Sequence, residues 1–347
     1  MLNNIRKSLT VFASALTLGV TATMMAGTAS AQEETFTWKV QSHWPGSSSS
    51  YKDSLGRLKE QLEERSDGRI QLELFEAGAL FKAQETFNAV SRGILEMGTI
   101  SPSYASDKMT LAGIASGLPF AFRNVWEAAY FHQGLGFEDM LREEAAQHGV
   151  YWSTDKVYPT EMVVKDPIES VEEFESLKIR SSGALQKFLT EAGAAASYIP
   201  GGELYTALDS GIVDGAHWGA AQGAYSMGLY EIAKHHVQPA LNIAGTDVII
   251  VSQKALDELP EDLQQLVKDV LNEQFWYRTN EYQYKERITL AKAISEEGVQ
   301  VNTLPQEVQD HLVQTAQAMW DEEGERSDKA AEALAMLKDF LSDLGYL

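Results

Sequence analysis

Hydrophobic and polar side chains alternate near the start of the chain and then change to helical spacing. Phe36, Trp38 and Val40 alternate with polar neighbours, which is the pattern of a half-buried strand. Beyond them we expect a helix at 51–65, a strand at 70–74, a helix through 87–91 and a strand at about 97–100. Helices and strands that alternate in this way predict a parallel α/β sheet.

The middle of the chain repeats this pattern, and the C-terminal part is mainly helical. We expect strands at 161–165 and 177–180, a helix at 183–194 and a strand at 196–200. A strand at 248–252 precedes two long helical stretches, at 261–297 and 306–344. The repeat predicts a second α/β unit, and because no linker rich in proline, glycine or serine separates the units, we expect them to be interwoven.

The first 31 residues have the pattern of a secretory signal peptide. Arg6 and Lys7 are basic, residues 9–27 are uncharged and mostly apolar, and Ala29-Ser30-Ala31 supplies the small residues that precede a cleavage site. We therefore expect cleavage before Gln32 and a periplasmic mature protein. No later segment approaches the roughly 20 apolar residues that a membrane-spanning helix needs.

Composition and charge exclude several function classes. The chain has 50 acidic against 28 basic residues and a formal net charge of −22, so it would repel nucleic-acid backbones. It contains no cysteine, which excludes thiol catalysis, disulfides and cysteine-ligated metal sites. The motifs of phosphate-binding loops, dinucleotide sites, serine-hydrolase elbows and zinc-protease helices are absent. We expect neither a nucleic-acid-binding protein nor an enzyme of these classes, and no cofactor.

Two motifs in the second α/β unit carry a family resemblance. Residues 171–180 read VEEFESLKIR, an acidic helical turn that leads into a short strand ending in arginine. Residues 201–215 read GGELYTALDSGIVDG. In this order and spacing the two motifs resemble those of the solute-binding proteins of TRAP transporters, the DctP-like family. The start of the second motif and the tryptophan after it, Trp218, are most similar to the branch that binds α-keto acids.

The resemblance extends over nearly all of the mature chain and implies a fold. This is a two-lobe α/β periplasmic binding protein with a hinge cleft, crossing strands and long C-terminal helices. The expected first lobe comprises 32–155 plus about 249–305, and the second comprises 156–248. Residues 306–347 are then C-terminal helices that pack on the lobes.

The resemblance also implies a function and a set of binding residues. A protein of this family captures a small organic anion and delivers it to a sodium-driven membrane permease, without catalysis. Arg180 matches the arginine that clamps the ligand carboxylate, and a guanidinium offers a carboxylate two parallel donors. Trp218 would form one wall of the cleft. We expect Tyr104, Trp44 and Trp152 to line the cleft as well.

His217 is a departure from the family pattern. In the α-keto acid branch the residue before the tryptophan is usually a glutamate that helps to hold a metal ion, and a second acid lies where this chain has 241–245. Because Na⁺ and Ca²⁺ prefer oxygen ligands, we expect binding here to be metal-independent, with His217 and Asn242 hydrogen-bonded to the ligand. Free histidine titrates near pH 6.5, so we expect binding to change between about pH 6 and 7.

Several alternatives stay open. Some relatives for dicarboxylates and sialate-type acids carry a second arginine where this chain has Thr160, so a single arginine favours a monocarboxylate, of the α-keto or 2-hydroxy type, over a dicarboxylate, an aromatic acid or a sugar acid. The protein could serve a chemoreceptor instead of a permease. It could also be an exported hydrolase or lyase with His217 as base and Asp214 as its partner. The C-terminal helices could exchange between two subunits of a homodimer.

Overall fold

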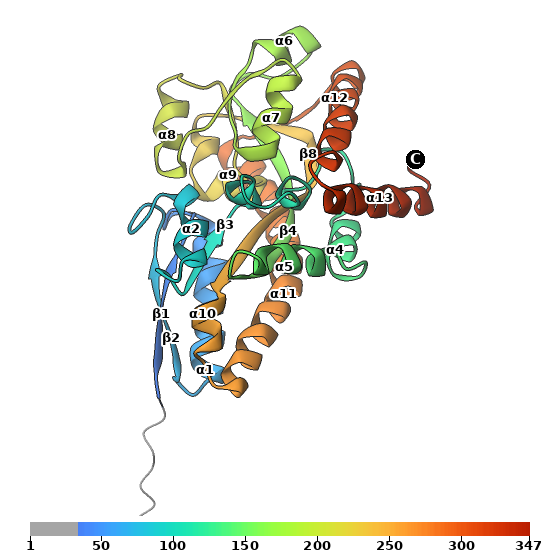
Figure 1. Cartoon of the computed structure of the whole chain (residues 1–347). Coiled ribbons are helices and arrows are strands. Elements are labelled where there is room, and N and C mark those ends of the chain that lie inside the picture. The colour runs from blue at the N-terminus through green and yellow to red at the C-terminus, as the bar shows by residue number, and fades with distance from the viewer. Residues whose placement is uncertain (1–33) are drawn as a thin grey trace, which may run out of the picture. The chain divides into compact units, whose positions relative to one another are not determined.

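A single mixed sheet organises the fold, and helices surround it (Figure 1). The computed structural model describes residues 34–347, and Thr35–Leu347 form one compact unit. The predicted signal peptide, 1–31, lies outside the described residues. Among the described residues, no helix combines the length and apolar character that crossing a membrane requires.

Nine strands of the described chain form the sheet. They are β1 (Phe36–Gln41), β2 (Ile70–Phe75), β3 (Met97–Ile100), β4 (Val150–Val164), β5 (Lys178–Arg180), β6 (Ala195–Ser197), β7 (Gly215–His217), β8 (His235–Ser252) and β9 (Gln300–Thr303). Their order is β2-β1-β3-β8-β4-β7-β5-β6, and β9 pairs with β8.

The helices before β8 are mostly short. They are α1 (Arg57–Arg65), α2 (Thr86–Ser91), α3 (Ala112–Ala115), α4 (Val125–Gln133), α5 (Phe137–Ala146), α6 (Val171–Ser176), α7 (Gly183–Glu191), α8 (Gly201–Asp209) and α9 (Ala221–Ser226). Single turns of other helix types occur at η1 (Tyr51–Gly56), η2 (Ala83–Glu85), η3 (Pro102–Ala105) and η4 (Leu229–Glu231). After β8 come α10 (Gln253–Asp257), α11 (Glu261–Glu297), α12 (Gln306–Gly324) and α13 (Asp328–Asp343).

Two parallel groups of strands flank a long antiparallel pair. β1 pairs in parallel with β2 and β3, and β5 pairs in parallel with β6 and β7. β4 and β8 lie between these groups and pair antiparallel with each other along most of their lengths. They are the predicted crossing strands, and they join the two α/β units into one sheet.

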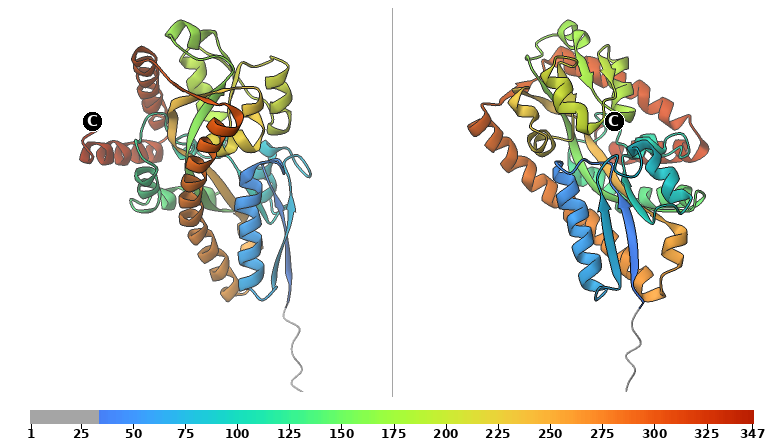
Figure 2. Two further views of the ribbon diagram at one scale, coloured as in Figure 1. Left: turned by 180° about the vertical axis from the view of Figure 1, so that it is seen from behind. Right: turned by 90° about the vertical axis from the view of Figure 1, so that its left-hand side faces the viewer.

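The core divides into clusters that follow the two strand groups. One cluster packs β1 and β2 against α1, α10 and the first part of α11, and another packs β5 against α6, α7 and α12. The helix α11 contacts both α1 and α9, and Figure 2 shows it running along the molecule. A single long helix therefore supports both units, as the family resemblance implies.

The structure refines the predicted elements. The expected helix at 261–297 coincides with α11, but the stretch at 306–344 is two helices, because Ser327 caps a new helix by accepting a hydrogen bond from the Ala330 N–H at 3.1 Å. β4 and β8 begin well before the expected strands at 161–165 and 248–252. The predicted lobe boundaries stay a prediction.

Candidate functional site

A cavity of about 100 Å³ lies where the carboxyl ends of parallel strands from both units meet. β1 is followed by His43 and Trp44, β3 by Tyr104, and β5 and β7 end in Arg180 and His217. All five residues line the cavity. The carboxyl ends of strands at a change in strand order are where open α/β sheets bind ligands.

Arg180 is the cation of this cavity. Its side chain is buried, its Nε donates to the Ile199 carbonyl at 3.0 Å and its Nη1 to the His217 carbonyl at 2.8 Å. No carboxylate lies within ion-pair distance of Arg180 among the described residues, and its burial lowers the pKa of the guanidinium. A buried, unpaired guanidinium is costly unless an anion joins it. The site is therefore prepared for a negative group.

Trp218 packs against this guanidinium. The Arg180 guanidinium carbon lies 4.7 Å from the centre of the Trp218 ring, within the range of cation–π contacts. Two glycines make room for the tryptophan. A Cβ on Gly201 would lie 2.3 Å from the indole, and one on Gly223 would lie 2.1 Å from the Trp218 carbonyl oxygen. Trp218 lines the cavity as predicted, although contact with a ligand stays a prediction.

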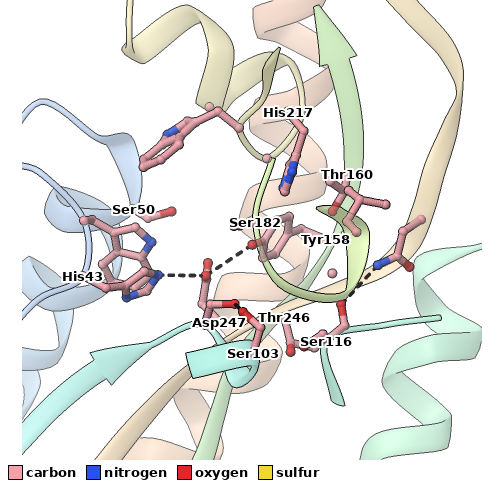
Figure 3. A pocket seen from close by; sticks show the side chains of 18 of the residues that line it. His43, Ser50, Ser103, Ser116, Tyr158, Thr160, Ser182, His217, Thr246 and Asp247 are labelled. Carbon is pink, nitrogen blue, oxygen red and sulfur yellow. Dashed lines mark hydrogen bonds and ion pairs between the residues drawn. The ribbon is translucent and has the colours of Figure 1, made fainter. Parts of the chain in front are cut away.

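His217 points toward the same cavity (Figure 3). Its Nδ1 lies 2.8 Å from the Ser181 hydroxyl, and its Nε2 has no hydrogen-bond partner among the described residues. Burial, together with the nearby Arg180 charge, lowers the pKa of His217 from 6.5 to about 3. The expectation that His217 titrates between pH 6 and 7 is therefore wrong for this site, because the residue stays neutral throughout that range.

We predict that this neutral histidine makes the ligand-free protein sensitive to acid. Between pH 6.5 and about 3 the unfolded chain binds a proton at His217 that the folded chain does not, so the free energy of unfolding falls as the pH falls. His217→Gln removes this contribution. In urea unfolding at pH 7.5 and 4.5, the wild type should lose up to about 2–3 kcal/mol more than the variant. Equal losses would contradict the buried, neutral histidine.

The remaining predicted site residues divide into two groups. Tyr104 and Trp44 line the cavity, as predicted. Trp152 does not: it is fully buried in the core and is not part of the cavity wall, which corrects the prediction. Its strand, β4, is buried on both faces in this part, so its side chain packs among helices instead of entering the cleft.

Asn242 also lines the cavity, but its amide is engaged with the backbone. Its Nδ2 donates to the carbonyls of Ser116 and Gly117, each at 3.2 Å, and its Oδ1 accepts from the Ala244 N–H at 2.7 Å. Both amide protons are thus used. These contacts hold Asn242 in the cavity wall, and its hydrogen bond to a ligand stays a prediction.

The chemistry of the donors around Trp218 does not suit a hard cation. His217 is an imidazole and not a carboxylate, Asn242 uses its amide protons on the backbone and accepts from the Ala244 N–H with its Oδ1, and Thr160 is neutral. Within residues 34–347, no cluster of three or more histidine or acidic side chains is arranged to hold a metal ion. Na⁺ and Ca²⁺ need several oxygen ligands, and these residues do not supply them.

Three cavity residues were not found from the sequence. Asp247 on β8 and Tyr158 on β4 line the cavity, and His43 contacts Asp247. The only local signal was a single acid directly before the apolar run at 248–251. Its meaning depends on the pairing of β8 with β4, which the sequence pattern did not reveal.

The geometry does not support the alternative of a catalytic pair formed by His217 and Asp214. Asp214 is not part of the cavity wall, and its carboxylate accepts a hydrogen bond from the Lys178 N–H at 3.0 Å. A histidine with a pKa of about 3 is also a poor general base at neutral pH. The arrangement at the cavity is one for binding an anion.

Comparison with known proteins places this fold and site in the class of solute-binding proteins. The model of the DctP family, bacterial extracellular solute-binding protein family 7, matches residues 41–327. The chain belongs to this family, which confirms the predicted family resemblance.

Individual relatives agree with this assignment. A monocarboxylate 2-oxoacid-binding periplasmic protein of Nostoc sp. is 26% identical over 254 residues, which are 71% of this chain and 68% of the relative. A solute-binding protein of a TRAP transporter from Bordetella bronchiseptica, a mixed-occupancy dimer with calcium and picolinate, covers 90% of this chain and 93% of its own, with a TM-score of 0.81 and 24% identity. A TRAP solute-binding protein from Pseudoalteromonas atlantica, with bound sodium and pyruvate, matches 90% of this chain and 95% of its own, with a TM-score of 0.81 and 23% identity. These similarities confirm the predicted two-lobe binding-protein fold.

Proposed function

We propose that the protein captures a small organic monocarboxylate in the periplasm and delivers it to the membrane permease of a TRAP transporter. The observation that carries this proposal is Arg180, a buried guanidinium at the wall of a small cavity, which has no carboxylate partner within residues 34–347. The relatives named for 2-oxoacid binding or bound to pyruvate and picolinate support a ligand of this size and charge.

The polar groups around Arg180 complete a site for a carboxylate. We assign the proton of His217 to Nε2, so that the Ser181 hydroxyl, which has no other partner among the described residues, donates to Nδ1. Nε2–H then faces the cavity as a second donor. Burial raises the pKa of the Tyr104 phenol, so this group also stays protonated. A cavity of about 100 Å³ is well below the roughly 300–1,000 Å³ of sites for drug-sized ligands, which favours a ligand of few atoms.

Closure around the ligand is the mechanism we propose. The segment after β1 contacts α9 near the cavity: the Gln222 Nε2 donates to the Asp53 Oδ2 at 2.9 Å, and the N–H of Ser49, a cavity residue, donates to the Ser226 hydroxyl at 3.3 Å. A ligand that binds both units stabilises this closed form over an open one. The closed protein is then the form that docks on the permease.

A thermal-shift screen tests the proposed function. The mature protein is heated with α-keto acids, 2-hydroxy acids, aromatic acids, dicarboxylates and sugar acids in turn. A ligand that binds only the folded state raises the melting temperature. We expect a small monocarboxylate to give the largest shift. A shift with dicarboxylates alone would contradict the proposal. It would mean that the site binds two carboxylates although Thr160 replaces the second arginine.

Metal-independence is a separate prediction. The residues around Trp218 do not provide the oxygen ligands that Na⁺ or Ca²⁺ needs, and the carboxylate of Asp247 in the same cavity is already bonded to Lys156, His43 and Tyr158. We therefore expect a chelator to leave the ligand-induced shift unchanged. The same titration in potassium and in sodium buffers should give the same dissociation constant. A shift that disappears with chelator, or one that requires sodium, would show that a cation takes part in binding.

The oligomeric state and the partner that receives the ligand are two further predictions. A homodimer formed through α12 and α13 is a prediction that size-exclusion chromatography with light scattering can test. The protein could deliver its ligand to a chemoreceptor instead of a permease. Genes for permease subunits beside this one would favour transport. Neither alternative changes the ligand site that the proposal describes.

A further inference from the structure

A second ionised group faces the cavity, and the capture of an anion does not explain it. Asp247 points into the cavity from β8, while His217 points into it from the other side (Figure 3). Its Oδ2 accepts a hydrogen bond from the Lys156 Nζ at 2.5 Å, and its Oδ1 lies 3.2 Å from both the His43 Nε2 and the Tyr158 hydroxyl. A carboxylate in the wall would repel an anionic ligand, so its presence calls for a further role in binding.

The hydrogen bonds around His43 show that it donates to Asp247. The Thr99 hydroxyl oxygen accepts a hydrogen bond from the His43 backbone N–H at 3.1 Å. The same oxygen lies 2.9 Å from the Nδ1 of the His43 ring. The hydroxyl proton is therefore free to bond Nδ1, which leaves the ring proton on Nε2, directed at Asp247. Tyr158 likewise has its phenol proton to donate, since burial raises its pKa.

Asp247 is held ionised from behind the cavity wall. Lys156 is completely buried, and it is shared between Asp247 and Asp155, whose Oδ2 lies 3.1 Å from the ammonium. Although burial alone would raise the pKa of Asp247, the Lys156 charge and the His43 hydrogen bond hold it well below its usual range. The cavity therefore presents a carboxylate and not a carboxylic acid.

One acceptor position of Asp247 remains. A carboxylate has about four lone-pair positions: Oδ1 accepts from His43 and Tyr158, and Oδ2 accepts from Lys156, which leaves one position on Oδ2. Because Asp247 lines the cavity as a carboxylate, the ligand atom that suits it is a hydrogen-bond donor. An oxygen without a proton would instead meet a negative charge in a buried site, where the loss of its hydrogen bonds to water is not compensated.

We propose that Asp247 is a specificity-determining residue, and that it selects carboxylates with a donor at the 2-position, a hydroxyl or an ammonium, over the matching 2-oxo acids. This inference rests on the proposed function, because the ligand carboxylate occupies Arg180. Because both residues line one cavity of about 100 Å³, we expect a ligand of a few atoms on Arg180 to place its 2-substituent near Asp247.

Calorimetric titration of the wild type with matched probes is the first test. The probes are L- and D-lactate against pyruvate, 2-hydroxybutyrate against 2-oxobutyrate, and L-alanine. A hydrogen bond to a charged group predicts that the 2-hydroxy acid, or alanine, binds roughly 10- to 100-fold more tightly than the 2-oxo acid. A tighter lactate assigns the donor as a hydroxyl, and a tighter alanine assigns it as an ammonium.

A pair of variants tests the residue itself. Asp247→Asn replaces an acceptor with an amide that can also donate, so the preference should fall to less than threefold or reverse. Asp155→Asn is the matched control, because Asp155 shares Lys156 but does not line the cavity. It should keep the wild-type ratio. If Asp247→Asn does not fold, the ratio of the wild-type affinities for the 2-hydroxy acid or alanine and the 2-oxo acid tests the proposal by itself.

The outcomes separate this inference from the proposed function. If pyruvate binds the wild type as tightly as lactate and alanine or more tightly, or if Asp247→Asn keeps the wild-type ratio, the role of Asp247 is refuted and anion capture by Arg180 stands. If none of these carboxylates binds, the proposed function fails, and this inference fails with it.

Discussion

Replacing Arg180 by alanine is expected to weaken binding of the carboxylate ligand by roughly 100-fold or more. The guanidinium is buried, has no carboxylate partner among the described residues and lies at the cavity wall, so the ligand supplies its counter-charge. Two charge-assisted hydrogen bonds of about 1.5–3 kcal/mol each account for a loss of this size. Calorimetric titration with the strongest ligand from the screen measures it.

Two control variants separate charge from geometry in this experiment. Arg180→Lys keeps the charge but not the planar fork, so we expect an intermediate loss. Arg65→Ala removes an exposed arginine whose partner is Glu273, and it should leave the affinity unchanged. Arg180 also donates to two backbone carbonyls, so its replacement could destabilise the fold. The melting temperature of each ligand-free variant is therefore compared with that of the wild type. A folded Arg180→Ala protein with near-native affinity would contradict the proposed site.

The family resemblance implied the fold and the ligand-binding roles of Arg180 and Trp218, and local order along the chain adds a physical reason for their position. β5 is short and ends in Arg180, and the next helix follows closely, so the arginine must lie at the carboxyl edge of the sheet. His217 and Trp218 follow the turn after α8 in the same way. Local order along the chain is enough to place such residues.

The opposite side of the site depends on contacts that no local pattern encodes. The first part of β8 contains a proline, an asparagine and a glycine, so it lacks the alternation of a strand, and its pairing with β4 was not predicted. This pairing brings Asp247 beside Lys156 and Tyr158. The error at Trp152 has the same origin, because a strand buried on both faces shows no period that separates core from cavity.

Replacing Lys156 by methionine is expected to destabilise the protein by about 3–5 kcal/mol, as is typical when one partner of a buried ion pair is removed. Lys156 is completely buried, and its single positive charge is shared between the carboxylates of Asp155 and Asp247. Asp155 is fixed in turn by hydrogen bonds from the Ser54 hydroxyl at 2.7 Å and the Gln274 Nε2 at 3.0 Å, so it cannot turn toward water. Without the ammonium, two buried carboxylates lose the counter-charge that they share, and urea unfolding of the ligand-free protein measures the resulting loss of stability.

The double variant Lys156→Met/Asp155→Asn should recover part of this loss, because it removes one of the two uncompensated charges. Lys338→Met is the surface control: its Nζ lies 2.7 Å from Asp321, but both side chains are exposed, so the loss should stay below about 1 kcal/mol. A loss below about 1 kcal/mol for Lys156→Met itself would mean that Asp247 takes up a proton when the lysine is absent. Asp247 would then face the cavity as an acid able to donate, so in that variant the preference for 2-hydroxy over 2-oxo acids should also disappear.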